Sequence, residues 1–194
     1  MLPMCSEVGY SKTFTQAFIY RQLPGSRMVF AGGARLGLAW GFAREAVDED
    51  GDVIVDENGN PVYVDDLPAS ERFYAGGDTT VRGYTLDRLG DDDTIDQDGF
   101  PLGGDAVVIF NGELRFPATR TLGGVVFVDA GNVFSRVANL DLSRIKATTG
   151  FGVRYKSPIG PLRIDLGFKL DPRVEPDGTK ERGYAFHISV GQAF

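Results

Sequence analysis

The 194-residue sequence has few of the residues that most often carry disulfides, metals or catalysis: one cysteine, one histidine, one tryptophan and three methionines. The single cysteine, Cys5, excludes an intrachain disulfide. No apolar run approaches the roughly 20 residues that a membrane-spanning helix needs, which excludes a helical membrane protein. The formal net charge of −7 comes without a clustered basic face, so we expect no nucleic-acid partner.

Glycine, phenylalanine and two acidic segments are abundant instead. The chain contains 26 Gly and 14 Phe. Acidic residues concentrate in DEDGDVIVDENG, from Asp48, and in GDDDTIDQDG, from Gly90, and both segments are typical of solvated loops. The DEDGD sequence is only superficially similar to a calcium loop, because its glycine stands at the fourth position and not at the sixth. Weak cation binding there stays an alternative.

Apolar residues alternate with small, polar or charged residues over several long segments. Residues 28–43 place Phe30, Leu36 and Trp40 on one face and Arg35 on the other. A period of two over this length predicts β-strands longer than most soluble strands. The same alternation recurs in residues 161–170 and 184–194, and less cleanly in residues 13–21, 106–116, 122–134 and 146–156. The sequence therefore predicts an all-β protein with seven strands.

The connections between these strands differ sharply in length. SPIGP, residues 157–161, predicts a tight turn, whereas residues 44–73 and 84–103 are long and polar. Short turns on one side and long loops on the other are typical of a transmembrane antiparallel β-barrel, whose strands must all find hydrogen-bonding partners. A soluble β-sandwich or lipocalin-like barrel is the alternative. The charged residues Arg163, Asp165 and Lys169, which alternate within one strand, disfavour it.

Five motifs occur in order along the chain: RFYAGGDTTVRGY, GGDAVVIFNGELRFP, GGVVFVDAGNVF, GVRYKSPIGPLRIDLGF and FHISVGQAF. This set, which covers about residues 10–194, resembles the Omp85 superfamily of outer-membrane assembly barrels, typified by BamA and TamA. The resemblance implies a sixteen-stranded barrel preceded by periplasmic POTRA domains. We therefore expect residues 1–194 to be the C-terminal portion of such a barrel, without POTRA domains, with long extracellular and lumenal loops within residues 44–105.

The resemblance also implies a role for the VRGY motif, which consists of Val81, Arg82, Gly83 and Tyr84. In the family this long loop folds back into the barrel lumen, and its arginine meets acidic groups on the inner wall. A guanidinium that leaves water needs a carboxylate partner. The candidates are Glu113, on the polar face of its strand, and Asp129, whose inward orientation the alternation supports less clearly. Gly76, Gly77 and Gly83 would let the loop turn tightly, and Tyr84 would pack or hydrogen-bond beside the arginine.

The end of the chain resembles the β-signal by which assembly machinery recognises outer-membrane proteins. This signal comprises Tyr184, Phe186, Ile188, Val190, Gly191 and Phe194. An unpaired strand edge invites the addition of another strand. The resemblance implies that the last strand pairs weakly with the first, so that a client strand can add at the opened seam.

We expect no enzyme activity, no catalytic or metal-binding residues and no cofactor. The only histidine, His187, has no nucleophile motif beside it, and GGD is not followed by a phosphate-loop lysine. The resemblance implies a BamA-type factor that inserts β-barrel proteins into the bacterial outer membrane, with a TamA-type factor or a two-partner secretion porin as alternatives. Expected partners are unfolded outer-membrane β-barrel clients, periplasmic chaperones, lipid and lipopolysaccharide, with accessory lipoproteins or an inner-membrane partner as further possibilities.

Overall fold

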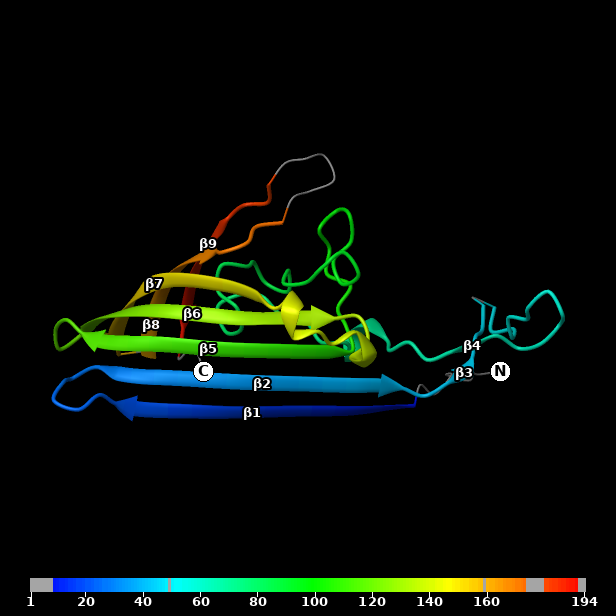
Figure 1. The fold of residues 1–194 in the computed structure, drawn as a ribbon, viewed down its shortest axis with the longest axis horizontal. Coiled ribbons are helices and arrows are strands. Elements are labelled where there is room, and N and C mark those ends of the chain that lie inside the picture. Colours follow the sequence, from blue (N-terminus) through cyan, green and yellow to red (C-terminus); the bar gives the residue numbers. More distant parts are fainter. Residues whose placement is uncertain (1–8, 49, 159, 174–179, 192–194) are drawn as a thin grey trace.

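The fold is one curved antiparallel sheet of seven strands in the order β1-β2-β5-β6-β7-β8-β9 (Figure 1). The computed structural model describes residues 9–48, 50–158, 160–173 and 180–191. The strands of the sheet are β1 (Tyr10–Gln22), β2 (Val29–Gly41), β5 (Ala106–Pro117), β6 (Leu122–Phe134), β7 (Lys146–Ser157), β8 (Gly160–Lys169) and β9 (Tyr184–Val190). The predicted all-β class and the seven predicted strands are therefore confirmed. None of the helices among the described residues is long and apolar enough to cross a membrane.

Connections of very different length alternate along the sheet, and Figure 1 shows the long ones together at one end. Residues 23–28, residues 118–121 and the turn after Ser157 form the short-turn end. The connections from β2 to β5, from β6 to β7 and from β8 to β9 leave the opposite end, which we call the long-loop end. The first of these contains the small hairpin of β3 (Arg44–Glu45) and β4 (Tyr63–Val64) and the 3-10 helix η1 (Ala69–Glu71). The second contains the 3-10 helices η2 (Val137–Asn139) and η3 (Leu142–Arg144).

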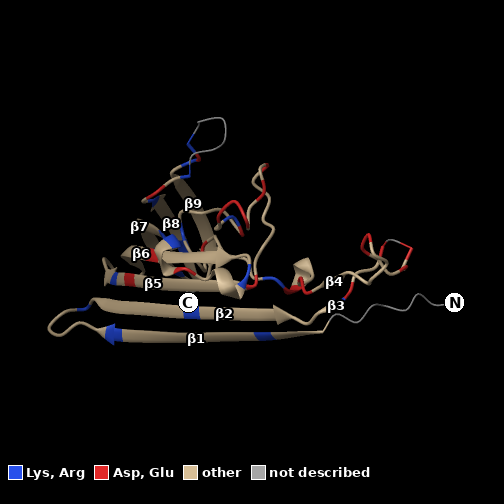
Figure 2. Ribbon diagram, turned by 45° about the vertical axis from the view of Figure 1, so that its right-hand side comes forward, with Lys and Arg blue, Asp and Glu red and all other residues tan. Residues whose placement is uncertain are grey.

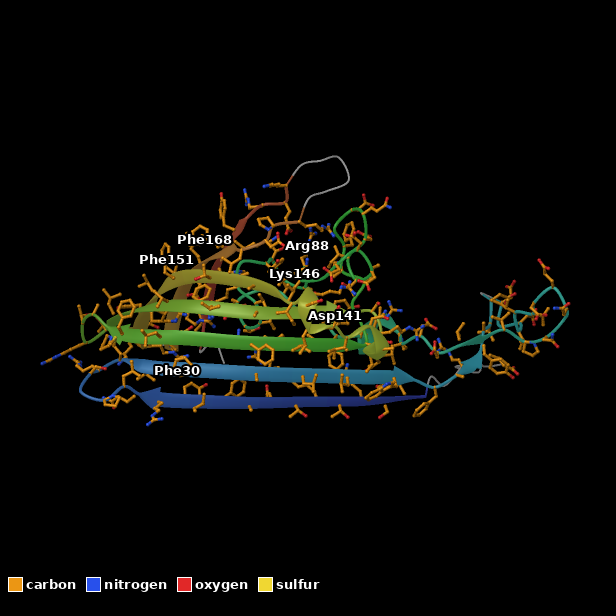
Figure 3. The ribbon with its side chains drawn as sticks, in the orientation of Figure 1. Phe30, Arg88, Asp141, Lys146, Phe151 and Phe168 are labelled. Atoms are coloured by element: carbon orange, nitrogen blue, oxygen red, sulfur yellow. The ribbon has the colours of Figure 1, made fainter. Side chains whose placement is uncertain are left out.

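The two faces of the sheet reverse the usual distribution of polarity. On the convex outer face the alternate residues are large, apolar and exposed: Phe30, Leu36, Trp40, Phe110, Phe116, Val126, Val128, Phe151, Val153, Ile164, Phe168, Phe186 and Ile188. Phe30, Phe151 and Phe168 mark this face on β2, β7 and β8 in Figure 3. On the inner face Glu113, Asp129 and Asp165 are almost completely buried. This pattern is typical of a sheet whose outer face contacts hydrocarbon and whose inner face lines a polar interior.

Strand β1 differs from the other strands because its aromatic residues lie on the inner face. The register pairs Phe18 with Gly33 and Phe14 with Gly37. A Cβ atom on Gly33 would lie 3.0 Å from the Phe18 ring, so the glycine leaves space for the aromatic side chain. Phe14 in turn stacks on Phe73 of the long connection, with 6.1 Å between the ring centres. The inner surface of β1 therefore helps to hold the start of the segment that carries the VRGY motif.

Three hairpin turns in the first long connection share one construction. The sequences DEDGD, DENGN and DQDGF begin at Asp48, Asp56 and Asp96. In each turn the first aspartate accepts hydrogen bonds through Oδ1 from the backbone amides two and four residues later. The glycine at the fourth position has a positive φ each time, between 78° and 90°. The acidic residues of these turns therefore build the turns themselves, as aspartate does in Asx-turns.

Candidate functional site

The VRGY motif lies against the inner face of the sheet within a small apolar core. Val81, Tyr84 and Leu89 are 0–2% exposed. They belong to one cluster with residues from β2, β5 and β6: Ala39, Val107, Ile109 and Val133. This segment, residues 73–89, is called the docked segment below. Its apolar contacts bring the arginine of the motif to the centre of the inner face.

Arg82 is bound by two carboxylates from adjacent strands. Its Nε and Nη2 atoms donate to the two oxygens of Asp129, at 2.7 and 3.0 Å, and Nη1 donates to Glu113 Oε2 at 2.6 Å. The backbone amide of Arg82 also donates to Asp129, at 3.1 Å. All three side chains are at most 1% exposed. A bidentate pair of this kind fixes orientation as well as charge. The structure thus brings together the arginine and both carboxylates that the sequence singled out.

Further charged groups extend this pair into a buried network that the sequence analysis did not identify. Asp165 on β8 lies 3.8 Å from Arg82 Nη1. Arg154 on β7 donates to both Asp165, at 2.6 and 3.1 Å, and Glu113, at 3.3 Å. Arg163 donates to Asp165 at 3.2 Å and to the carbonyl oxygen of residue 78 at 2.7 Å. The strand alternation had placed Arg163 and Asp165 on one face, but only the sheet order shows that this face lies beside Arg82.

Phe127 and Asn111 complete the surroundings of the arginine. The Arg82 guanidinium carbon lies 3.6 Å from the centre of the Phe127 ring, which is a close cation–π contact. Asn111 donates to Asp129 Oδ1 at 2.9 Å and to the carbonyl oxygen of Thr80 at 2.6 Å. Asn111 therefore ties the backbone of the docked segment to the same carboxylate that holds the arginine.

Glycines on both sides of the contact let the two backbones approach each other. Gly76, Gly77 and Gly83 have positive φ angles of 117°, 103° and 104°, a conformation that glycine adopts without strain. On the opposing strand β8, a Cβ atom on Gly167 would lie 2.6 Å from the amide nitrogen of Gly83 and 2.7 Å from the carbonyl carbon of Arg82. Gly167, which the sequence analysis did not select, is therefore part of the surface that receives the docked segment.

Tyr84 and His187 form two further contacts between the docked segment and the sheet: Tyr84 of the segment lies against Lys169, and His187 of β9 lies against Gly83. Tyr84 is 2% exposed, and its ring lies 4.3 Å from Lys169 Nζ, while its hydroxyl has no hydrogen-bond partner among the described residues. Burial, with smaller contributions from Glu181 and Asp171, raises the pKa of this hydroxyl. His187 on β9 accepts a hydrogen bond through Nε2 from the amide of Gly83, at 3.4 Å. The last strand of the sheet therefore touches the VRGY motif directly.

A second polar anchor lies at the long-loop end, where Figure 3 marks Lys146 at the start of β7. Asp91 forms ion pairs with Lys146 at 2.9 Å and Arg144 at 2.8 Å, and accepts a hydrogen bond from Asn132 at 2.8 Å. Burial acts to raise the pKa of Asp91, but the hydrogen bonds and charges of these partners outweigh it and lower the pKa below its ordinary value. The long connection is thus fixed both before and after residue 89.

The residues of the expected β-signal lie on the outer face of β9. Tyr184, Phe186, Ile188 and Val190 are 46–67% exposed, whereas Ala185 between them is buried. Gly191 has a φ of 119° and donates its amide to the carbonyl oxygen of Pro161 at 2.8 Å. Phe194 lies outside the described residues. The apolar row of the expected signal is therefore one continuous face of the edge strand.

The described part of the chain contains no group of three or more His, Cys, Asp or Glu side chains arranged to hold a metal ion. The acidic side chains at the centre are engaged instead by arginine. The arrangement can hold a long loop on the inner face of a sheet, and its chemistry is that of a buried ion-pair network.

Comparison with known proteins places this geometry in a family. The Omp85 superfamily domain matches residues 6–194. The chain is 34% identical over 132 residues to the outer membrane protein assembly factor BamA of Nitratidesulfovibrio vulgaris, covering 66% of this chain and 16% of that protein. It is 30% identical over 129 residues to the outer envelope protein 80, chloroplastic, of Arabidopsis thaliana, covering 62% of this chain and 15% of that protein.

A solved structure shares the fold. The crystal structure of BamA from Haemophilus ducreyi lacking POTRA domains 1–3 superposes with a TM-score of 0.62 at 23% identity, covering 91% of this chain and 34% of that one. The chain therefore spans about a third or less of each of these relatives. The family expected from the ordered motifs is confirmed, and with it a protein that is not an enzyme. The chain belongs to the Omp85 superfamily.

Proposed function

We propose that this chain is the C-terminal part of the barrel of a BamA-type assembly factor, which inserts β-barrel proteins into the bacterial outer membrane. The observation that carries the proposal is the docked segment, whose buried arginine is bound by carboxylates from β5 and β6 on the inner face of a sheet with an apolar exterior. Residues 44–105 would supply the extracellular and lumenal loops. The remaining strands and the POTRA domains would come from further parts of the whole protein.

The outer face supports a membrane location. On β2 the exposed apolar residues run from Phe30 to Trp40, which at about 3.3 Å per residue spans roughly 33 Å along the strand. Tilted by about 40° in a bilayer, this length matches an apolar band of about 25 Å. Such a continuous apolar face would be unfavourable in water, because soluble monomers rarely expose patches larger than a few hundred Å².

The buried network supports a structural brace within the lumen. Ion pairs taken out of water are costly unless their geometry and hydrogen bonds are nearly complete, as they are around Arg82. The brace would fix the loop to the wall formed by β5, β6 and β8. It would thereby keep this wall in one shape while the strands at the seam move.

Strand β9 supports insertion by strand addition. It is seven residues long, and its pairing partner among the described strands is β8 alone. Its outer face carries the row from Tyr184 to Val190, so a strand that pairs with its free edge would enter with an apolar surface beside it. In the whole protein this edge would form the weak seam with the first strand, where a client strand adds.

The relative named BamA, at 34% identity, favours this type over the TamA type. The docked segment lies over the inner face. A two-partner secretion porin, the other alternative, would pass its substrate through the lumen and should conduct when this segment is displaced. Partners of the whole protein would be unfolded outer-membrane β-barrel clients delivered by periplasmic chaperones, with accessory lipoproteins. An inner-membrane partner would accompany the TamA type instead.

The test is a client-folding assay with the full-length protein in lipid vesicles. A urea-denatured β-barrel client is added, and its folding is followed by the heat-modifiable band on a gel. The proposal predicts faster folding than in empty vesicles. A Gly167→Ala variant, which we expect to displace the docked segment, should reduce the acceleration, and Gly112→Ala is its matched control. Equal folding rates with and without the wild-type protein would refute an insertion function.

A further inference from the structure

The two ends of the sheet differ in charge. The segments that form the short-turn end, residues 21–29, 114–122 and 154–162, contain no aspartate or glutamate. Their cations are Arg21, Arg27, Arg115, Arg120, Arg154 and Lys156. Most of the acidic residues lie on the long connections at the opposite end, as Figure 2 shows. The short-turn end is therefore a basic surface on a protein whose net charge is −7.

Two of these cations belong to the buried network, and four do not. Arg115 and Arg154 lie 2.6 and 3.3 Å from Glu113. The other four are exposed, and within the described ranges none of them forms an ion pair with a carboxylate. We call these four the basic rim: Arg21, Arg27, Arg120 and Lys156. Their charges are directed to the surroundings of the protein.

The basic rim lies next to the end of the apolar outer face. Phe116, Leu122 and Tyr155 are 38–43% exposed there, and the register pairs Leu122 with Tyr155. Aromatic side chains of this kind mark the boundary between hydrocarbon and headgroups in membrane proteins. Lys156 and Arg120 lie one and two residues beyond Tyr155 and Leu122, at the depth of lipid phosphates. The rim therefore combines the position and the charge that a headgroup contact requires.

A cavity at this end is lined by both cationic and apolar side chains. Its volume is about 500 Å³, and its lining includes Arg27, Lys156, Phe116 and Tyr155, with no carboxylate. A site that places cations beside aromatic and aliphatic walls suits an amphiphile with an anionic head. An acidic polypeptide would need the cations to follow one groove, whereas these are spread over three separate turns along the edge of the sheet.

We propose that the basic rim binds the phosphate groups of anionic phospholipids in the leaflet that adjoins the short turns. This rests on the proposed membrane-spanning barrel. Each cation near an anionic membrane surface contributes about a fivefold gain in affinity. The rim would fix the depth of the barrel in the bilayer on this side, while the acidic loops at the other end would repel anionic lipid. The barrel would thus distinguish the two leaflets by charge.

The experiment compares two triple variants of the full-length protein in a neutral detergent. One carries Arg27→Gln, Arg120→Gln and Lys156→Gln on the rim. The matched control carries Arg88→Gln, Lys180→Gln and Arg182→Gln at the long-loop end, with the same change of charge. Fluorescent phosphatidylglycerol and phosphatidylcholine are titrated into each protein. We expect the rim variant to lose about tenfold or more in affinity for phosphatidylglycerol, with phosphatidylcholine binding and the control variant unchanged.

Several outcomes would overturn the proposal. Equal losses in both triple variants would indicate a general effect of net charge, and a wild-type protein without preference for phosphatidylglycerol would show that no such site exists. Displacement of the lipid by inorganic phosphate at matched ionic strength would assign the site to free phosphate. Rim-dependent binding of a polyglutamate peptide, without rim-dependent lipid binding, would assign the surface to protein. A protein that stays in water without detergent would overturn the proposed function as well, whereas a heat-modifiable barrel without lipid preference would leave it intact.

Discussion

The connection between β2 and β5 contains two parts of equal length that differ in composition and in structure. The docked segment, residues 73–89, is held by an apolar cluster and by a buried arginine. Residues 46–62, the outlying segment, form two exposed hairpin turns that extend beyond the sheet (Figure 1). The docked segment has three glycines and two aspartates, whereas the outlying segment has two glycines and six acidic residues. The difference shows that docking depends on a few residues with partners on the wall.

The largest effect should come from removing the charge at the centre of the docked segment. Arg82→Ala leaves Glu113 and Asp129 buried without their main partner, and loss of one member of a buried ion pair costs about 3–5 kcal/mol. The free energy of unfolding of the full-length barrel in detergent, measured with urea, checks this. The control is Arg44→Ala, which breaks a surface ion pair with Asp66 just outside the outlying segment and should cost less than about 1 kcal/mol. A similar loss in the free energy of unfolding in both variants would contradict the idea that the buried arginine holds the docked segment more strongly than surface ion pairs do.

The next effect should come from the wall opposite the docked segment. In Gly167→Ala the new methyl group would lie within 2.6–2.9 Å of backbone atoms of Arg82 and Gly83, so the segment must shift. Overpacking of this kind costs about 1–3 kcal/mol. The matched control is Gly112→Ala on β5, where the nearest atom is a carbonyl oxygen at 3.8 Å. Protease cleavage within the docked segment should increase in the first variant and stay unchanged in the second. Resistance of the Gly167 variant would mean that the backbone contact is dispensable.

These residues also show how far the sequence predicts such a site. Alternation placed Glu113 on a polar face, and the resemblance supplied Arg82 and Asp129 as its companions. Alternation alone could not select Asp165, Arg154 or Gly167, because it assigns a residue to a face but not to a neighbour on another strand. That information depends on sheet order and register, which arise from contacts between distant segments.

The outlying and docked segments were also predicted less distinctly than the strands. Residues 44–105 are expected to be loops throughout. Nothing local separates DEDGD at Asp48, in the outlying segment, from DQDGF at Asp96, which follows the docked segment and whose turn is built in the same way. Asp91 lies just before the second turn and pairs with Lys146 and Arg144. These partners are more than 50 residues away, so the fixing of this part of the connection could be recognised only in the folded structure.

A smaller effect should appear as a dependence of stability on pH at Asp91. Its pKa is lowered in the folded protein, so its stabilisation is complete above the unfolded value of about 4 and is lost as pH falls through the lower folded value. Asp91→Asn should therefore destabilise the protein by up to about 1 kcal/mol at neutral pH. The difference from wild type should shrink below pH about 4. Urea unfolding of both proteins at several values between about pH 2 and 7 measures this difference in the free energy of unfolding. Asp50→Asn in the outlying segment is the charge-matched control, and because this side chain is exposed it should change the free energy of unfolding by less than about 0.5 kcal/mol at neutral pH.

The smallest effect should follow from removing most of the outlying segment. The amide of Ala46 donates to the carbonyl oxygen of Val62 at 2.8 Å, so the two residues already face each other as the ends of a hairpin. Replacing residues 47–61 by Asn-Gly would close this pair with a two-residue turn. Because the deleted side chains are mostly exposed, the free energy of unfolding should change by less than about 0.5 kcal/mol. A loss as large as that of Gly167→Ala would show that the outlying turns also hold the docked segment in place, and the two parts of the connection would then form one cooperative unit.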